Sequence, residues 1–287
     1  MKRFSLGWFL ALALAGAGCD RPATRPGADS PRIVSHSPAL TRILIDLGLS
    51  KHIVGVTRYC PSVPDANVPA VGDLTRVNTE AILATDPDVV LIQQKREDFD
   101  LLSKVRPEIR VEHFQIDRLE DIPVAALRIG KIVGKPDIAR RAAHAFHGKL
   151  QFVRMTVIGR DRPSVLFVMG TTRPSVHAEG TFVDDLITTA GGVNAAKSIP
   201  GARKWRKATL ETIASAGPDV LIVQSSPGKV DAARAYWSQW KQIPAVAAGR
   251  VHVVTDEAWM TPTLQLADLA ADLADMIHPD RPTGESR

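Results

Sequence analysis

Residues 136–157, PDIARRAAHAFHGKLQFVRMTV, predict a single long helix near the middle of the chain. Pro136 suits the first helical position, where a backbone N–H would have no partner inside the helix. From Ile138 to Val157, apolar side chains recur every three or four residues, which places them in one stripe. A helix of this length spans about 30 Å, the width of a small domain. We therefore expect it to connect two parts of the molecule.

The segments on either side of this helix resemble each other. EAI at 80–82 is followed by DPDVVLIQ at 86–93, whereas ETI at 211–213 is followed by GPDVLIVQ at 217–224. Each copy predicts a helix and then a continuous apolar strand, which is typical of a parallel sheet covered on both faces. A chain of 287 residues is long enough for two such units. The predicted fold class is α/β, with two parallel-sheet βα lobes joined by a single long rigid helix.

Composition and periodicity also predict where these units begin and end. The stretch DRPATRPGADSP is rich in proline and polar residues, so it predicts a flexible tether and not a packed segment. The predicted units are a signal peptide at 1–18, the tether at 19–31, a first lobe at 32–118, linking helices at 119–160, a second lobe at 161–278 and a polar tail at 279–287.

The first 18 residues are typical of an export signal. Lys2 and Arg3 precede a short apolar run, and small residues then lead to Cys19. This pattern resembles a bacterial lipoprotein signal, in which Cys19 receives the lipid, although Gly16 stands where that motif normally has Leu. We expect an exported protein that is lipid-anchored to a membrane, in the periplasm or on the cell surface. The alternative is ordinary cleavage, which would free Cys19 to pair with Cys60 in an oxidising compartment.

The charge balance gives little support for a polyanionic partner. Removing Lys2 and Arg3 from the 36 basic residues leaves 34 against 31 acidic ones, a net charge of +3. No block of Lys or Arg is interleaved with aromatic residues, as a nucleic-acid-binding surface would require. We therefore expect no nucleic-acid partner. We also expect the protein to be a monomer.

A cleft between the two lobes is the expected position of a ligand. In open parallel sheets, ligands bind beyond the carboxyl ends of the strands, and two facing lobes would bring those ends together. Flat aromatic surfaces with polar groups between them suit a large planar ligand, although each aromatic residue could instead pack beneath a loop. The predicted ligand-binding residues are Ser35, His36, Arg58, Tyr59, Asp73, Trp205 and Trp259.

The sequence lacks the common catalytic patterns. No Gly-rich phosphate loop follows a strand, and there is no nucleophile elbow and no Cys-x-x-Cys spacing. We expect neither an enzyme nor a resident cofactor or metal. As alternatives, His36 and His177 could face each other and bind a metal together with a carboxylate. His144 and His147, three residues apart on the long helix, could share another.

Glu80 and Glu211 occupy the same position in the two repeats. Each would fall in the first turn of a helix, where the helix dipole favours a carboxylate. The dipole explains either residue alone, but it does not explain why both repeats have one. Their recurrence would place an acidic residue on the exposed top of each lobe.

Six segments of the sequence form a recognisable pattern. The segments are RIVSHSPALTRILIDLGL (32–49), IVGVTRYCPSVP (53–64), VGDLTRVNTEAILATDPDVVLI (71–92), GGVN (191–194), WRKATLETIASAGPDVLIV (205–223) and IPAVAAGRVHVV (243–254). Together they resemble periplasmic substrate-binding proteins of metal-chelate ABC importers, and are most similar to the cobalamin-binding branch. The resemblance implies two α/β lobes joined by a rigid helix, a cleft that holds cobalamin or a related corrinoid, and an ABC permease with its ATPase as partners. A ferric siderophore or haem is the alternative ligand, and a metallocofactor-processing enzyme is the alternative of another class.

The resemblance also implies roles for particular residues. Glu80 and Glu211 match the acidic positions that meet arginines of the permease, so they are expected to dock the protein on its importer. Tyr59 and Trp205 match positions near the ligand loops of the family, and Trp259 matches less closely. His36 stands where the family has an apolar residue, which keeps haem or a bare metal among the possible ligands. Because the connecting element is a helix, only a small closure is expected on binding.

Overall fold

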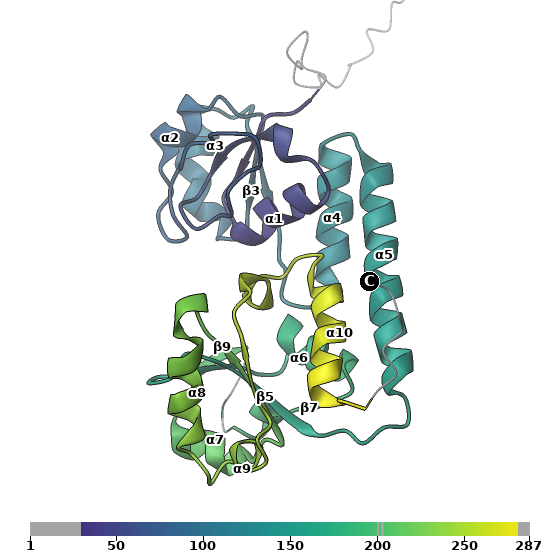
Figure 1. Ribbon diagram of the computed structural model, residues 1–287. Helices are drawn as coiled ribbons and strands as arrows, with labels where there is room; N and C mark the ends of the chain where they lie inside the picture. The colour runs from purple at the N-terminus through teal and green to yellow at the C-terminus, as the bar shows by residue number, and fades with distance from the viewer. Residues whose placement is uncertain (1–29, 200, 202–203, 281–287) are drawn as a thin grey trace, which may run out of the picture.

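The structure, a computed structural model, describes residues 30–199, 201 and 204–280 (Figure 1). The predicted signal peptide, nearly all of the predicted tether with Cys19, and most of the predicted tail lie outside these residues. Within the described part of the chain, no helix is both long enough and apolar enough to cross a bilayer.

The first lobe is a four-stranded sheet in which every strand is parallel to its neighbours. Its strand order is β2-β1-β3-β4, with Ile33 of β1 aligned with Ile53 on one side and Val89 on the other. All four residues of β3 are buried, as the continuous apolar run predicts. The strands are β1 (Ile33–Ser35), β2 (Ile53–Val56), β3 (Val89–Ile92) and β4 (Arg110–His113), and the helices are α1 (Pro38–Asp46), α2 (Thr79–Ala84) and α3 (Asp100–Val105).

Two packed helices connect the lobes (Figure 1). The first is α4 (Asp121–Ile132), and the second is α5 (Pro136–Val157), whose bounds coincide with the predicted helix. The two helices approach each other closely at Gly130, where a Cβ atom would lie 2.4 Å from the Cβ atom of Ala139. Only glycine fits at that contact, so the turn that reverses the chain between α4 and α5 depends on it.

The second lobe contains a larger, mixed sheet. Strands β10, β9 and β5 are parallel in that order, and β7 is also parallel to β5, whereas β6 pairs antiparallel with both β5 and β8. The parallel prediction therefore holds for the centre of this sheet but not for one side of it. A loop of five residues beginning at Gly170 joins β5 to β6, and a connection this short makes an antiparallel pair. The strands are β5 (Ser164–Met169), β6 (Ser175–His177), β7 (Val193–Asn194), β8 (Trp205–Lys207), β9 (Val220–Gln224) and β10 (Val251–Val254).

Among the described residues of the second lobe, five α-helices lie around this sheet, and the last of them returns to the connecting helices. α10 packs against both α5 and α6 (Figure 1). The helices are α6 (Phe182–Thr189), α7 (Leu210–Ala216), α8 (Val230–Ser238), α9 (Pro244–Ala247) and α10 (Leu266–Ile277).

One buried apolar cluster runs through both lobes. It includes Leu44 of α1, Phe146 and Val153 of α5, and Leu273 of α10. The remaining face of each sheet has a separate core, so the shared cluster lies on the side of the connecting helices. The apolar stripe of α5 therefore packs the two lobes against a common support, as a rigid connection requires.

Candidate ligand-binding cleft

Two adjoining pockets lie between the lobes. The Tyr59 pocket, of about 290 Å³, is lined from the first lobe by Arg42, Tyr59 and Cys60 and from the second lobe by the segment between Asp256 and Gln265. The Leu74 pocket, of about 330 Å³, is more apolar and is lined by Ala39, Leu74, Gln93, Met260 and Pro262, among others. Pro38 and Thr261 belong to both pockets, so the two cavities are parts of one cleft.

Three of the predicted ligand-binding residues lie together on the first lobe. Arg58 and Tyr59 are exposed in the loop after β2. Arg58 Nη2 is 3.6 Å from Asp73 Oδ2, and Asp73 Oδ1 accepts hydrogen bonds from the N–H groups of Thr75 and Arg76 at 2.8 and 2.9 Å. The hydrogen bonds from Thr75 and Arg76 and the charge of Arg58 hold the pKa of Asp73 below its ordinary value. Asp73 is therefore ionised at neutral pH and pairs with Arg58, but of these three residues only Tyr59 lines one of the two pockets.

Ser35 and His36 do not reach the cleft, so the prediction that they line it is corrected. Both residues are completely buried at the end of β1, an interior strand of its sheet. Ser35 Oγ accepts a hydrogen bond from Thr41 Oγ1 at 2.8 Å, and the His36 ring packs edge-on against Phe99. These side chains belong to the interior of the first lobe, because Thr41 of α1 and the ring of Phe99 pack over the end of β1.

The two tryptophans of the second lobe lie in different environments. Trp259 is buried and stacks on Phe167 at a centroid distance of 6.2 Å, so it packs inside the lobe and offers no flat surface to the cleft. This corrects the prediction for Trp259. Trp205 is about half exposed on β8, and its ring lies over His177 at a centroid distance of 3.6 Å. It does not line either of the two pockets, so the structure does not bring it together with Tyr59.

His177 cannot face His36 across the cleft. It is completely buried among Phe167, Phe182 and Trp205, and burial lowers its pKa to about 3. Neither ring nitrogen has a hydrogen-bond partner among the described residues. Each histidine therefore belongs to the interior of its own lobe, and the proposed metal site between them is corrected.

Glu80 and Glu211 are both exposed in the first turn of their helices. Hydrogen bonding to Thr209 lowers the pKa of Glu211, which is therefore ionised at neutral pH. In Figure 1, α2 and α7 lie toward opposite ends of the long axis, on the side away from α5. This placement agrees with one acidic group on each lobe, as the repeated sequence suggests.

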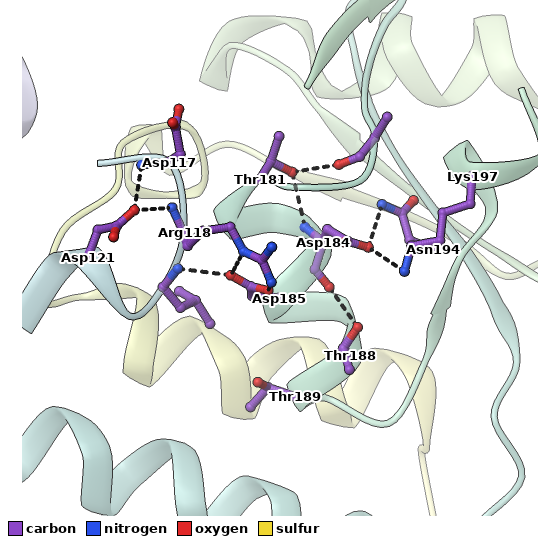
Figure 2. Close-up of polar contacts among 12 residues, drawn as sticks. Asp117, Arg118, Asp121, Thr181, Asp184, Asp185, Thr188, Thr189, Asn194 and Lys197 are labelled. Carbon is purple, nitrogen blue, oxygen red and sulfur yellow. Dashed lines mark hydrogen bonds and ion pairs between the residues drawn. The ribbon is translucent and has the colours of Figure 1, made fainter. Parts of the chain in front are cut away.

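A polar clamp, formed by Arg118, Asp121 and Asp185, fixes the point where the chain leaves the first lobe (Figure 2). Arg118 makes two contacts with the carboxylate of Asp185 on α6, one of them Nε to Oδ2 at 2.7 Å, and Leu119 N donates to the same carboxylate at 3.0 Å. Asp121 Oδ2 accepts hydrogen bonds from the N–H groups of Asp117 and Arg118 at 2.9 and 2.8 Å. The clamp therefore ties the start of α4 to the second lobe.

Sequence reasoning missed the clamp, because Arg118 and Asp185 are separated by 67 positions. It also missed Arg42 and most of the segment that lines the second-lobe side of the cleft. The one available signal was position, because residues 256–265 follow the last strand, at the carboxyl end where ligands are expected.

Two α/β lobes, a cleft lined by both of them and a fixed helical connection define a two-lobed binding protein. The periplasmic binding protein family matches residues 33–258, and the chain belongs to this family. The predicted family and fold class are thereby confirmed. Members of the family are binding proteins and not enzymes, so the prediction of a non-enzymatic protein is also confirmed.

Relatives with known ligands cover most of the chain at low identity. The vitamin B12-binding protein of Pectobacterium carotovorum subsp. carotovorum (strain PC1) is 22% identical over 245 residues, which cover 84% of this chain and 85% of that protein. The cobalamin-binding protein of Halobacterium salinarum (strain ATCC 29341 / DSM 671 / R1) is 24% identical over 286 residues, covering 92% and 76%.

Solved structures of similar proteins share the fold. The periplasmic vitamin B12 binding protein BtuF of Vibrio cholerae has a TM-score of 0.74 at 19% identity, over 86% of this chain and 98% of that one. The periplasmic heme binding protein HutB of Vibrio cholerae has a TM-score of 0.76 at 18% identity, over 87% and 99%. At these identities the likeness concerns the fold alone.

Proposed function

We propose that this chain is the exported, lipid-anchored substrate-binding protein of an ABC importer, and that it captures cobalamin or a related corrinoid between its lobes. The observation that carries the proposal is the pair of adjoining pockets lined by residues of both lobes. The vitamin B12- and cobalamin-binding relatives support the choice of ligand. Tyr59, which lines this cleft, is the leading ligand contact, and exposed Arg58 beside it in the sequence is a second candidate. Half-exposed Trp205 lines neither pocket and would contact only a ligand that extends beyond them.

The size of the pockets sets a condition on binding. Each holds about 300 Å³, at the low end of the range of ligand sites, whereas a corrin with its side groups is larger than a drug-sized molecule. A corrinoid must therefore occupy both pockets at once. Pro38 of α1 and Thr261 line both pockets, so in this proposal the segment around Thr261 moves away from α1 to join them. The clamp and α5 can stay in place during this local movement.

Delivery to the permease would depend on Glu80 and Glu211. Both carboxylates are exposed, and neither lines the described pockets. In this proposal they pair with arginines of the permease, Cys19 carries the lipid, and the protein acts as a monomer. The permease would work together with its ATPase.

Haem or a ferric siderophore is the second candidate ligand. It is favoured by the haem-binding proteins among the structures that share the fold. His36 gives it no support, because its ring is buried in the first lobe.

The test is direct binding of cyanocobalamin to the purified chain from residue 19 onward, measured by calorimetry and by co-elution of corrin absorbance. We expect one-to-one binding, weakened about tenfold or more by Tyr59→Ala, because an aromatic contact at the cleft is lost. Phe152→Ala removes a similarly exposed aromatic ring on α5 and is the matched control. Binding of hemin or of a ferric siderophore, but not of cyanocobalamin, would favour the second candidate, and binding of none of the three would contradict a chelate receptor.

A further inference from the structure

An apolar stripe is exposed at the end of α5 that belongs to the second lobe. The exposed fractions of Phe152, Met155 and Ile158 are 50, 64 and 76%. Side chains three residues apart lie on one side of a helix, and Ile158 continues the spacing at the helix terminus. Val153 and Val157 point the other way, into the core. This end of α5 is therefore apolar toward the protein and also toward solvent.

The surroundings of the stripe are basic. Residues 149–162 contain Lys149, Arg154, Arg160 and Arg162 but only one acidic residue, Asp161, and Lys149 is paired with Asp268 of α10. Arg154 and Arg160 form no ion pair with any other described residue. Arg154 Nη2 donates to Thr189 Oγ1 at 3.4 Å, and Arg160 Nη2 donates to the carbonyl of Asp280 at 3.1 Å. Both acceptors are uncharged oxygen atoms, so these contacts leave the two guanidinium groups positively charged.

The position of the stripe separates it from the other candidate surfaces. α5 forms one side of the molecule and runs past both lobes, whereas α2 and α7 lie on the opposite side (Figure 1). The described chain begins near the first lobe, and the stripe lies at the end of α5 next to the second lobe. The stripe is therefore remote from the proposed docking glutamates and from the start of the described chain.

We propose that Phe152, Met155 and Ile158, with Arg154 and Arg160, form a contact surface for a membrane that contains anionic lipids. Exposed apolar side chains beside Arg and Lys are the pattern by which helices bind the interface between headgroups and acyl chains. The apolar side chains would enter that interface, and the guanidinium groups would pair with lipid phosphates. A second copy of the chain is a poorer occupant, because pairing two such surfaces would bring like charges together.

This contact would give the protein two orientations at the membrane. With α5 on the lipid surface, the helices α2 and α7, which carry Glu80 and Glu211, would lie on the side away from the membrane, and the protein would have to turn over to dock on a permease. This consequence rests on the proposed function, whereas the lipid contact itself does not depend on which ligand is bound.

The test uses the chain from residue 19 onward with Cys19→Ser, which cannot carry a lipid. It is sedimented with vesicles of phosphatidylglycerol mixed with phosphatidylcholine, and with vesicles of phosphatidylcholine alone. We expect binding to the anionic vesicles only, and weaker binding as salt is raised. Phe152→Ser with Met155→Ser should lower the partition coefficient about tenfold. Arg154→Gln with Arg160→Gln should lower it in the same direction.

The matched control is Leu101→Ser with Val105→Ser. These residues of α3 are exposed by 60 and 53%, similar to the stripe, but lie on the first lobe. We expect the control to bind vesicles as the parent does. The proposal is overturned by an absence of binding to anionic vesicles, or by an equal loss in the control. It is also overturned by a lipid-free dimer that the Phe152 and Met155 substitutions abolish, since a second copy would then cover the stripe.

Discussion

The two lobes contain the same helix–strand unit but differ in the residues around it. In each lobe a short helix with an exposed glutamate in its first turn leads to a buried parallel strand, as in α2–β3 and α7–β9. In the first lobe, Arg58 and Tyr59 are exposed on the loop that precedes this unit. The second lobe buries Trp259 and places Trp205 over a buried histidine.

The difference shows what a repeat can and cannot predict. Residues that recur in both units, such as Glu80 and Glu211, occupy equivalent places, because the helix and strand around them are equivalent. Loop residues have no counterpart, so their position depends on the sheet to which the loop belongs. Among the described residues, antiparallel strand pairs occur in the second lobe, where β6 pairs with β5 and β8, and Trp205 is part of β8.

The largest expected effect is the loss of uptake when the two equivalent glutamates are both removed. Under the proposed function, Glu80→Ala with Glu211→Ala should abolish importer-dependent uptake and leave chelate affinity unchanged, because neither carboxylate lines the pockets. Uptake by cells and calorimetry of the purified protein measure the two quantities. Glu97→Ala with Asp231→Ala removes one exposed carboxylate from each lobe elsewhere and should have no effect. A fall in affinity of the first variant would place a glutamate in ligand binding.

The buried histidines should make the stability of the protein depend on pH. The pKa of His177 lies at about 3 in the folded chain, below its ordinary 6.5, so between these values the unfolded chain binds a proton that the folded chain does not. The free energy of unfolding should therefore fall by about 1.36 kcal/mol per pH unit as pH is lowered through this window.

Single substitutions can show how much the buried histidine of each lobe contributes to this pH dependence of stability. His177→Phe keeps an aromatic ring in the second lobe and should reduce the pH slope measured by urea unfolding. His36→Phe should do the same for the first lobe, since burial also lowers the pKa of His36. His144→Phe, at an exposed position of α5, is the control. An unchanged slope in His177→Phe would mean that this ring is already protonated in the folded protein.

The clamp should contribute to stability by an intermediate amount. Asp185→Ala leaves Arg118 and Leu119 N without their partner, which should lower the free energy of unfolding by about 1–3 kcal/mol. Urea unfolding followed by tryptophan fluorescence measures the change, and Asp231→Ala, an exposed carboxylate of α8, is the control. A variant as stable as the parent would show that α5 and α10 alone hold the lobes.

The smallest expected effect concerns the residues that cap the N-termini of the two repeated helices, α2 and α7. The side chain of Asn78 accepts a hydrogen bond from Ala81 N, and the side chain of Thr209 accepts one from Thr212 N. Asn78→Ala and Thr209→Ala should each lower the free energy of unfolding by about 1 kcal/mol, because one N-terminal N–H loses its acceptor. Ser103→Ala, at an exposed position of α3, is the control for urea unfolding. A loss confined to one variant would show that only that helix depends on its cap.

The regular elements were the part of the fold that the sequence predicted best. The bounds of α5 agree with its apolar periodicity, and the continuous apolar run of the first repeat forms β3, all of whose residues are buried. The burial of His36 was not predictable from nearby residues, because it depends on β1 being an interior strand beneath α1. The contact of Arg118 with Asp185 was not predictable either, since no local pattern records which distant segments meet.

The last segment of the chain has a consequence for the order in which the protein is completed. Residues 256–265 close the cleft against the first lobe, and α10 then packs on α5. During synthesis, β1 to β4 can form their sheet early, because every strand of that sheet precedes α4 in the sequence. The cleft is different, because its second wall emerges only with the final tenth or so of the chain. All four strands of the first lobe are therefore synthesised well before the residues that complete the cleft, and the core that this lobe shares with α5 and α10 is completed only with α10.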